Sequence, residues 1–392
     1  MNYERILADN AKQLKPSGIR KFFDVAATIP GAISLGVGEP DFATPWSVRD
    51  AAIKSIQKGI TQYTSNGGLP ELRKKIAEYM EERFSLSYEP LSEVIVTVGA
   101  SEGIDITLRA LLNPGDEVLV AEPCFVSYAP CVRLCNGVPV PVSCDFEHSF
   151  KLLPEAIEAA VTPRTKAILF NYPSNPTGAV MSEEELVAVA KVIKKYNLIA
   201  LSDEIYSELT YSGKHVSIAS LPGMQERTVV LNGFSKAFSM TGWRIGFLCA
   251  PKELAGVILK IHQYVIMCAP TPSQYAALAA LTEGLEDGFS VVEEMRNEYD
   301  KRRRFVYESL KSMGLETFEP LGAFYIFPQV SALGLDGDSF AEELLAAQAV
   351  AVVPGSAFGT FGKDNVRISY AYSMRDLDRA IERIQKFIAQ RK

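Results

Sequence analysis

Between residues 90 and 250 the chain alternates short apolar runs with stretches that are apolar on one side only. One such stretch opens with Ser182 and Glu185 at the spacing of a capping box and continues with apolar residues at helical spacing. Strands that alternate with helices predict a mostly parallel sheet covered by helices on both faces. The predicted strands occupy residues 94–98, 118–121, 167–170, 198–202, 228–231 and 245–250.

Beyond about residue 285 the pattern of apolar positions changes. A long, highly charged helix is predicted over residues 291–312, and an amphipathic helix is predicted to begin near Ser373. Short strands are predicted between these two helices, at residues 323–328, 350–353 and 366–369. Together these elements predict a second, smaller domain of the α+β type.

The composition limits the classes of function. Of the 392 residues 47% are apolar and 22% are charged, as in an ordinary globular protein, and the formal net charge is −7. An acidic chain disfavours a nucleic-acid-binding surface. No apolar stretch approaches the roughly 20 residues that cross a bilayer, and the amino terminus lacks the apolar core of a signal peptide. We therefore expect a cytoplasmic protein with neither a nucleic-acid partner nor a membrane partner.

Four of the six cysteines lie between residues 124 and 144, a grouping that invites a metal-site interpretation. Their spacing does not match the paired cysteines of zinc sites, and no histidine stands at zinc-motif distance from a pair. We expect no bound metal, and reduced thiols in a structural role.

The strongest chemical signal follows the predicted strand 228–231. Asn232 and Gly233 form a turn signal, Ser235 and Lys236 come next, and Arg244 follows eight residues after the lysine. A lysine amine forms a Schiff base with a carbonyl, and an arginine presents a planar fork to phosphate. Most lysines are solvated surface groups, so the interpretation depends on what accompanies this one. The combination suits an aldehyde that carries a phosphate.

Other polar motifs follow other predicted strands, at the edge where parallel sheets bind ligands. Asp203 ends one strand and Tyr206 follows three residues later, while Asn175 opens an Asn-Pro-Thr-Gly loop after another. A turn of small residues from strand to helix offers backbone N–H groups and a helix dipole to a phosphate. Three of its residues are the candidate phosphate ligands Ala100, Ser101 and Glu102, the last through its N–H group alone.

These motifs, in this order and over nearly the whole chain, resemble those of pyridoxal-phosphate (PLP) aminotransferases of fold type I, class I/II, and in particular the bacterial aromatic and aspartate types. The resemblance implies that Lys236 binds the PLP aldehyde and transfers protons, and that Asp203 pairs with the pyridine nitrogen. It implies that Tyr206 and Asn175 reach the O3′ atom of PLP. It assigns the phosphate to Ser235 and Arg244 together with residues 100–102.

The same resemblance implies further site residues. Phe125 is expected to stack on the pyridine ring, and Tyr63 to reach the phosphate of a neighbouring subunit, so that a homodimer shares its active sites. Arg367, Gly38 and Asn175 are expected to bind the substrate α-carboxylate. Ile19 is expected to contact the substrate, and together with Phe22, Phe23 and Tyr325 it favours an aromatic or bulky side chain. The chain departs from many relatives at Gly233, where they carry a hydroxyl.

The resemblance also implies the organisation of the chain. It predicts an amino-terminal arm with part of the small domain at residues 1–45, a large PLP-binding domain at 46–285 and a small carboxyl-terminal domain at 286–392. The expected reaction moves an amino group from an L-amino acid, aromatic or otherwise bulky, to a 2-oxo acid by a ping-pong mechanism. Three alternatives stay open: an aminotransferase for aspartate, one for acylated diaminopimelate, and a PLP-dependent C–S β-lyase. A PLP-fold transcription regulator is disfavoured by the charge.

Overall fold

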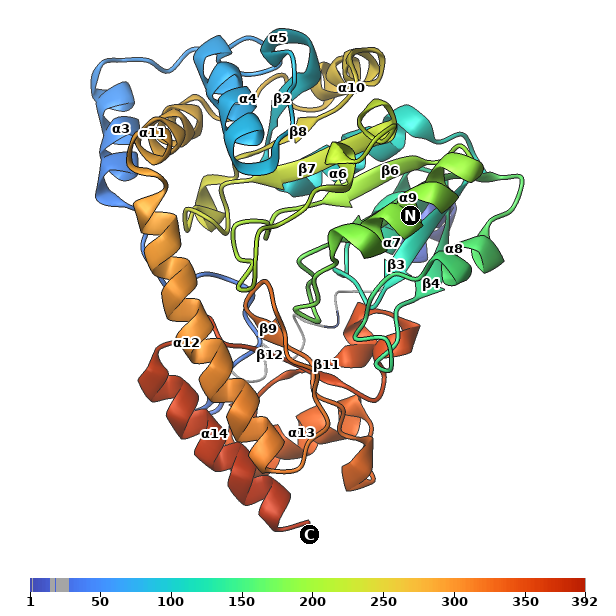
Figure 1. The fold of residues 1–392 in the computed structure, drawn as a ribbon, viewed down its shortest axis with the longest axis vertical. Helices are drawn as coiled ribbons and strands as arrows, with labels where there is room; N and C mark the ends of the chain where they lie inside the picture. Colours follow the sequence, from blue (N-terminus) through green and yellow to red (C-terminus); the bar gives the residue numbers. More distant parts are fainter. Residues whose placement is uncertain (2, 15–17, 19–27, 392) are drawn as a thin grey trace.

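The computed structural model of the chain describes residues 1, 3–14, 18 and 28–391. At its centre lies a seven-stranded sheet in which only β8 runs against its neighbours, and all other pairings are parallel (Figure 1). The mostly parallel sheet predicted from the sequence is therefore confirmed. In spatial order the strands are β2 (Val94–Thr97), β8 (Gly246–Cys249), β7 (Thr228–Gly233), β6 (Ile199–Asp203), β5 (Thr165–Asn171), β3 (Glu117–Glu122) and β4 (Val138–Ser143).

The sequence prediction missed β4, the strand at one edge of this sheet. Its segment alternates valine with Pro139 and Pro141, and a proline in an apolar run argues against a central strand. An edge strand leaves one row of its N–H groups unpaired, so proline is tolerated there. β4 is also more exposed than its neighbour β3, all of whose residues are buried. The six strands that were predicted are continuous apolar runs because both faces of the sheet are covered.

Helices bury both faces of the sheet. On one face, alternate residues of the strands, such as Val118 and Val120, pack against α6, α7 and α10. On the other face, Leu119 and Ala121 pack against α8 and α9, while β2, β7 and β8 meet α3, α4 and α11. The predicted capping box is present at the start of α9. The bounds are α3 (Trp46–Gln57), α4 (Pro70–Phe84), α5 (Pro90–Glu93), α6 (Gly99–Leu111), α7 (Tyr128–Leu134), α8 (Pro154–Ala160), α9 (Glu183–Lys195), α10 (Lys252–Val265) and α11 (Thr271–Asp287).

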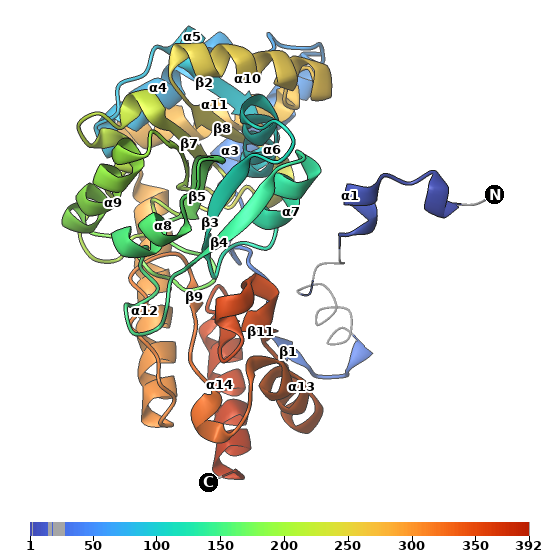
Figure 2. The same ribbon diagram turned by 90° about the vertical axis from the view of Figure 1, so that its right-hand side faces the viewer.

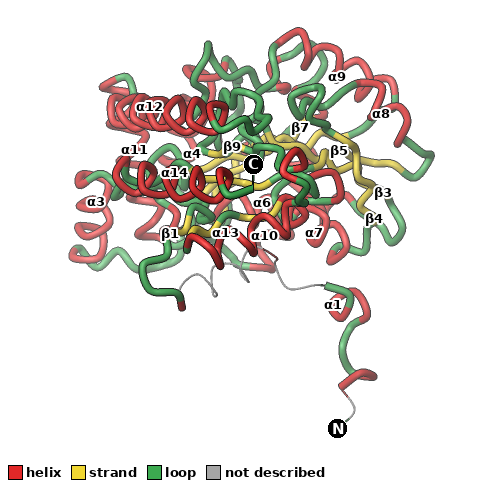
Figure 3. Tube along the Cα trace, turned by 90° about the horizontal axis from the view of Figure 1, so that it is seen from below, coloured by secondary structure: helices red, strands yellow, loops and turns green. Residues whose placement is uncertain are grey.

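A second layer of structure forms a separate core below the large sheet. Its long helix α12 (Ser290–Ser312) runs down from the large sheet, and α14 (Met374–Ala389) lies beside it (Figures 1 and 3). A three-stranded antiparallel sheet joins β11 (Val353–Pro354), β12 (Val366–Ser369) and β9 (Tyr325–Ile326). β1 (Ile33–Ser34) pairs with β10 (Val350–Ala351), and α13 (Gly337–Gln348) packs nearby.

The details of this second core differ from the prediction in strand length. The predicted strand 323–328 is only two residues long, and 350–353 divides into β10 and β11 around Val352. The predicted final helix is present, with Ser373 as its cap. The domain boundaries at 45 and 285 stay predictions.

Near the amino terminus, α1 (Asp9–Lys12) reaches α7 at the edge of the molecule (Figure 2). Across the described residues, every helix is too short or too polar to span a bilayer.

Candidate active site

A cavity of about 500 Å³ opens beyond the carboxyl ends of β5, β6 and β7. Its walls come from the large sheet, the start of α6, the loop after β1, and strands β9 and β12 of the second core. The motifs that the sequence scatters over more than 300 residues therefore meet in one place. The predicted site residues in its lining are Gly38, Ala100, Ser101, Phe125, Asn175, Asp203, Tyr206, Ser235, Lys236, Arg244 and Arg367.

Lys236 lies just past β7, on a half-buried turn that faces the cavity. Its Nζ donates a hydrogen bond of 2.6 Å to the carbonyl oxygen of Gly38. Burial lowers the pKa of this amine to about 8, with Arg367 and Arg244 acting in the same direction and Glu39 opposing. Near neutral pH a useful fraction of the amine is therefore uncharged, as a nucleophile toward an aldehyde must be.

Asp203 is the last residue of β6, and its carboxylate faces the same cavity. It accepts hydrogen bonds from the Tyr128 hydroxyl at 2.6 Å and from the backbone N–H of Ile205 at 3.1 Å. Burial raises the pKa of Asp203 to about 6, and these two hydrogen bonds limit the rise. At pH 7 the group is an anion. The sequence analysis did not identify Tyr128, because only the tertiary fold brings the start of α7 against the end of β6.

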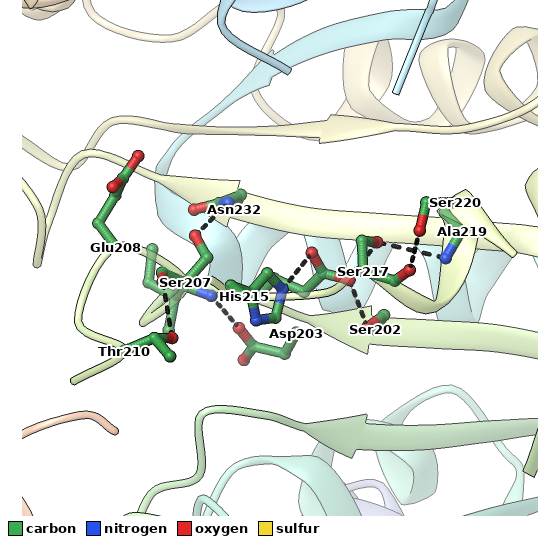
Figure 4. Close-up of polar contacts among 12 residues, drawn as sticks. Ser202, Asp203, Ser207, Glu208, Thr210, His215, Ser217, Ala219, Ser220 and Asn232 are labelled. Atoms are coloured by element: carbon green, nitrogen blue, oxygen red, sulfur yellow. Dashed lines mark hydrogen bonds and ion pairs between the residues drawn. The ribbon is translucent and has the colours of Figure 1, made fainter. Parts of the chain in front are cut away.

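The segment behind Asp203 is held by a second carboxylate, Glu204, which is buried and does not line the cavity. Its two oxygens accept hydrogen bonds from Ser202 at 2.8 Å, Ser217 at 2.7 Å and the His215 ring at 2.9 Å. Figure 4 shows Ser202, Ser217 and His215 close together next to Asp203. They fix the backbone that carries Asp203.

Tyr206 and Tyr325 join the large sheet to the second core. Their hydroxyl oxygens are 2.8 Å apart, and the Tyr325 ring lies 4.4 Å from the guanidinium carbon of Arg367. The Tyr325 hydroxyl also explains why residue 38 is glycine, because a Cβ atom there would lie only 2.2 Å from it. The predicted carboxylate ligands Gly38 and Arg367 therefore share one aromatic neighbour.

Arg367 is buried on β12, with one nitrogen that has no partner. Its Nη1 donates to Asn175 Oδ1 at 2.7 Å, and its Nη2 donates to the carbonyl oxygen of Gly36. Its Nε is buried and makes no hydrogen bond. Burial lowers the pKa of this guanidinium. Because unpaired buried donors are costly, the free Nε indicates a place for an anionic ligand.

The opposite end of the cavity is suited to a phosphate. Helix α6 starts there, and the side chain of its cap residue, Val98, makes no hydrogen bond to the first turn. Gly99 has a positive φ of 73°, and a Cβ atom on it would lie 2.7 Å from Nη2 of Arg244. The guanidinium therefore lies directly against the first turn of the helix. With Ser235, these groups form a cradle of donors for an anion.

Five residues that the sequence analysis named for the site lie outside the cavity lining or outside the described residues. The carboxylate of Glu102 accepts hydrogen bonds from the Val98 N–H at 2.5 Å and from His262 Nδ1 at 2.7 Å. Tyr63 is 80% exposed and does not line the cavity. Ile19 lies outside the described residues, as do Phe22 and Phe23.

The departure at Gly233 has a steric reason. A Cβ atom at this position would lie 2.8 Å from the Cα of Gly246 on the adjacent strand β8. A hydroxyl-bearing side chain does not fit there. In the cavity lining, the hydroxyl group nearest in sequence to Lys236 is that of Ser235.

Phe125 also lines the cavity, with its ring edge-on to Tyr128 at 5.9 Å between centroids.

Comparison with known proteins agrees with this geometry. Residues 30–384 match the family model for aminotransferase class I and II. The Bacillus subtilis protein YugH is 54% identical over 97% of this chain and 98% of its own length. Aromatic-amino-acid aminotransferase 2 of Thermococcus litoralis is 44% identical over 98% of this chain and 99% of its own. The structure of aspartate aminotransferase from Thermus thermophilus with maleate matches with a TM-score of 0.92 at 39% identity, covering 97% of this chain and 99% of that one.

The family resemblance, the fold class and the enzyme class predicted from the sequence are thereby confirmed. The relatives differ in the substrate that their names give, so the family alone leaves the amino donor open. Members of this family exchange amino groups between amino acids and 2-oxo acids. The chain belongs to the class I and II aminotransferases, the PLP-dependent enzymes of fold type I.

Proposed function

We propose that this chain moves the amino group of an aromatic or otherwise bulky L-amino acid to a 2-oxo acid, with PLP bound at Lys236. The observation that carries the proposal is the single cavity in which Lys236, Asp203, Arg244 and Arg367 meet. The amine suits an aldehyde, the carboxylate suits a pyridinium nitrogen, and the two guanidinium groups suit a phosphate and a carboxylate.

The residues present fit PLP along the length of the cavity. The first turn of α6, Ser235 and the exposed Arg244 would hold the phosphate, and Asp203 would pair with the ring nitrogen. Tyr206 and Asn175 would bond O3′, and Phe125 would cover the ring. When bound there, PLP supplies a conjugated ring that withdraws electrons from the carbon bearing the amino group.

The chain's own groups would carry the proton and orient the substrate. Lys236, with a pKa of about 8, would take the proton from the substrate α-carbon and return it to the C4′ position of PLP. To do so it must leave the Gly38 carbonyl oxygen that it bonds here. Asp203, an anion at pH 7, would keep a proton on the ring nitrogen. Arg367 would use its free Nε, and Asn175 its amide, to fix the substrate carboxylate.

The preference for a side chain without charge is supported by the cations of the cavity. Among the described lining residues these are Lys236, Arg244 and Arg367, and each already has a part in binding PLP or the α-carboxylate. Glu39 also lines the cavity and would repel a second carboxylate on the substrate. The family resemblance implies a lysine in many aspartate-preferring members at the position that Ser101 occupies in this chain. Tyr325 supplies an aromatic wall.

Steady-state kinetics with phenylalanine, tyrosine, aspartate and alanine as amino donors test the substrate class. We expect the largest kcat/KM with an aromatic donor when all four donors are measured with the same 2-oxo acid acceptor. A clear preference for aspartate would reject the proposal. Release of pyruvate and sulfide from cysteine without any acceptor would favour a C–S lyase instead.

We also propose a homodimer in the cytoplasm, with Tyr63 of one subunit reaching the phosphate end of the other. Support comes from the 80% exposure of Tyr63 and from an apolar segment close to its loop. Asn66, on that loop, donates to the carbonyl oxygen of Met267 at 3.0 Å. The exposed apolar residues at this end of α10 are Tyr264, Val265, Ile266 and Met267. Sedimentation at micromolar concentration should give a mass of two chains.

A further inference from the structure

A fully buried histidine lies behind the phosphate end of the cavity and takes no part in the reaction. His262 sits in the last turn of α10, with none of its side chain exposed. Its Nδ1 lies 2.7 Å from Oε1 of Glu102, and its Nε2 is buried without a partner. An ionised carboxylate only accepts hydrogen bonds, so Nδ1 carries the proton in this pair. Among the described residues, Nδ1 is therefore the only atom of the His262 ring that makes a hydrogen bond.

Glu102 is a negatively charged residue beside a site that is suited to an anion. It belongs to the first turn of α6, whose N–H groups form the anion cradle, and its side chain is only 10% exposed. One of its oxygens accepts from the Val98 N–H and the other from His262. Each oxygen therefore has one donor, and the two donors come from different elements. This arrangement turns the negative charge away from the cavity, which Glu102 does not line.

Removal of the His262 donor would let the Glu102 carboxylate compete with a phosphate in the anion cradle. One oxygen of a mostly buried carboxylate would lose its partner, which is costly for a charged group. The first-turn N–H groups of α6 are then the available donors on its own helix. These are the donors that a phosphate needs, and the carboxylate would compete for them and repel the phosphate charge.

We propose that His262 is a positioning residue for the phosphate end, holding the Glu102 carboxylate out of the anion cradle through Nδ1 alone. This inference rests on the proposed function, because PLP provides the phosphate. A positioning role through Nδ1 predicts different effects of two substitutions at residue 262, which a role in packing alone does not. An asparagine at 262 keeps an N–H donor near the place of Nδ1 and loses only the unpartnered half of the ring. A leucine keeps apolar bulk and loses the donor.

The experiment measures the affinity of the PLP-free protein for PLP by visible absorbance, and for inorganic phosphate as a competitor. For His262→Leu we expect the dissociation constants of both to rise about ten-fold, while for His262→Asn they stay within about three-fold of wild type. Adding Glu102→Gln to His262→Leu removes the unpaired charge and should restore most of the affinity. Glu102→Gln alone should bind phosphate at least as tightly as wild type.

His215 offers a matched control. It is also a nearly buried histidine bonded to a buried glutamate, Glu204, but that glutamate follows β6 and is not part of the first turn of α6. His215→Leu should lower the thermal unfolding temperature as His262→Leu does, but leave phosphate affinity within about two-fold.

The outcomes separate the two proposals. If wild type gives no visible band with PLP, the proposed function fails and the inference fails with it. If wild type binds PLP but the leucine variant binds as wild type does, or the asparagine variant loses as much affinity as the leucine variant, His262 is a packing residue only. If His262→Leu does not fold, Glu102→Gln alone decides, because weaker phosphate binding by that variant would overturn the inference.

Discussion

The region of the cavity where the PLP ring would lie, the ring end, is built differently from the region where the substrate carboxylate would bind, the carboxylate end. At the ring end, Asp203 is the last residue of β6, Lys236 follows the neighbouring parallel strand β7, and the Tyr128 hydroxyl bonds Asp203 from the start of α7. At the carboxylate end, Arg367 comes from β12 in the second core and Gly38 from the loop after β1. The ring end is rigid by construction, since hydrogen-bonded strands fix its residues. The carboxylate end exists only when two separate cores meet.

On the proposed function, this difference separates the residues that would hold PLP from the residues that would bind the substrate carboxylate. The hydrogen bond between Tyr206 and Tyr325 and the bond between Arg367 and Asn175 each join a segment that follows a strand of the large sheet to a strand of the small sheet. Substrate carboxylate binding at Arg367 would therefore strengthen contacts between the cores, as in enzymes that close over their substrates. Changes at the ring end should weaken PLP binding or chemistry, whereas changes at the carboxylate end should weaken substrate binding.

The largest effect is expected at the ring end, from Lys236→Ala. This change removes both the amine that binds the aldehyde and the base that moves the proton, so turnover should fall by at least about four orders of magnitude. Single-turnover rates with phenylalanine measure the loss. A variant that keeps more than about a tenth of wild-type activity would show that residue 236 is not the base.

Asp203→Asn should reduce kcat by about three orders of magnitude, because the amide cannot keep a proton on the ring nitrogen. The side chain keeps its size, and its oxygen can still accept from Tyr128, so the fold should persist. Rapid-scan absorbance during the half-reaction measures this step separately from product release. An unchanged rate of α-proton removal would contradict the assigned role.

At the carboxylate end, Arg367→Gln should weaken amino-acid binding and leave PLP binding nearly unchanged. The loss of a bidentate partner for the carboxylate should raise KM for the amino acid about 100-fold, while PLP affinity stays within about two-fold of wild type. Titration of the variant with PLP and with donor amino acids provides both numbers. If PLP affinity fell as much as amino-acid affinity, the two ends would not be separable.

The smallest effect is expected from Tyr128→Phe. Burial raises the pKa of Asp203 to about 6, and the Tyr128 hydroxyl opposes that rise. Without this hydroxyl the pKa of Asp203 should rise further. As the pH is lowered, the carboxylate should then become protonated at a higher pH than in wild type. PLP affinity of the PLP-free protein should therefore begin to drop at a pH about one unit higher than in wild type. Equal pH profiles would show that the hydrogen bond does not tune Asp203.

The ring end was also the easier part to predict from the sequence. Asp203, Asn175 and Lys236 each follow an apolar run, and the rule that ligands bind at the carboxyl ends of parallel strands brings such residues together. The carboxylate end gave no comparable signal, because an arginine in a short alternating strand is ordinary. Arg367 was identified only by resemblance to a family.

Other features could not be predicted because they depend on contacts between distant segments. The contacts of Tyr128 and His262 with two carboxylates appear only once α7 and α10 pack on the sheet. β4 was missed for a local reason, since its two prolines mask a strand that an edge position tolerates. The steric need for glycine at 38 and 233 likewise comes from atoms far away in sequence or on a neighbouring strand.

On the proposed function, one amine, Nζ of residue 236, forms the covalent bond to PLP. Reduction of the purified protein with borohydride in the presence of PLP converts that bond to a stable secondary amine, which peptide mass mapping locates. We expect one pyridoxyl group per chain, on the peptide that contains Lys236. No label, or a label on a different lysine, would contradict it.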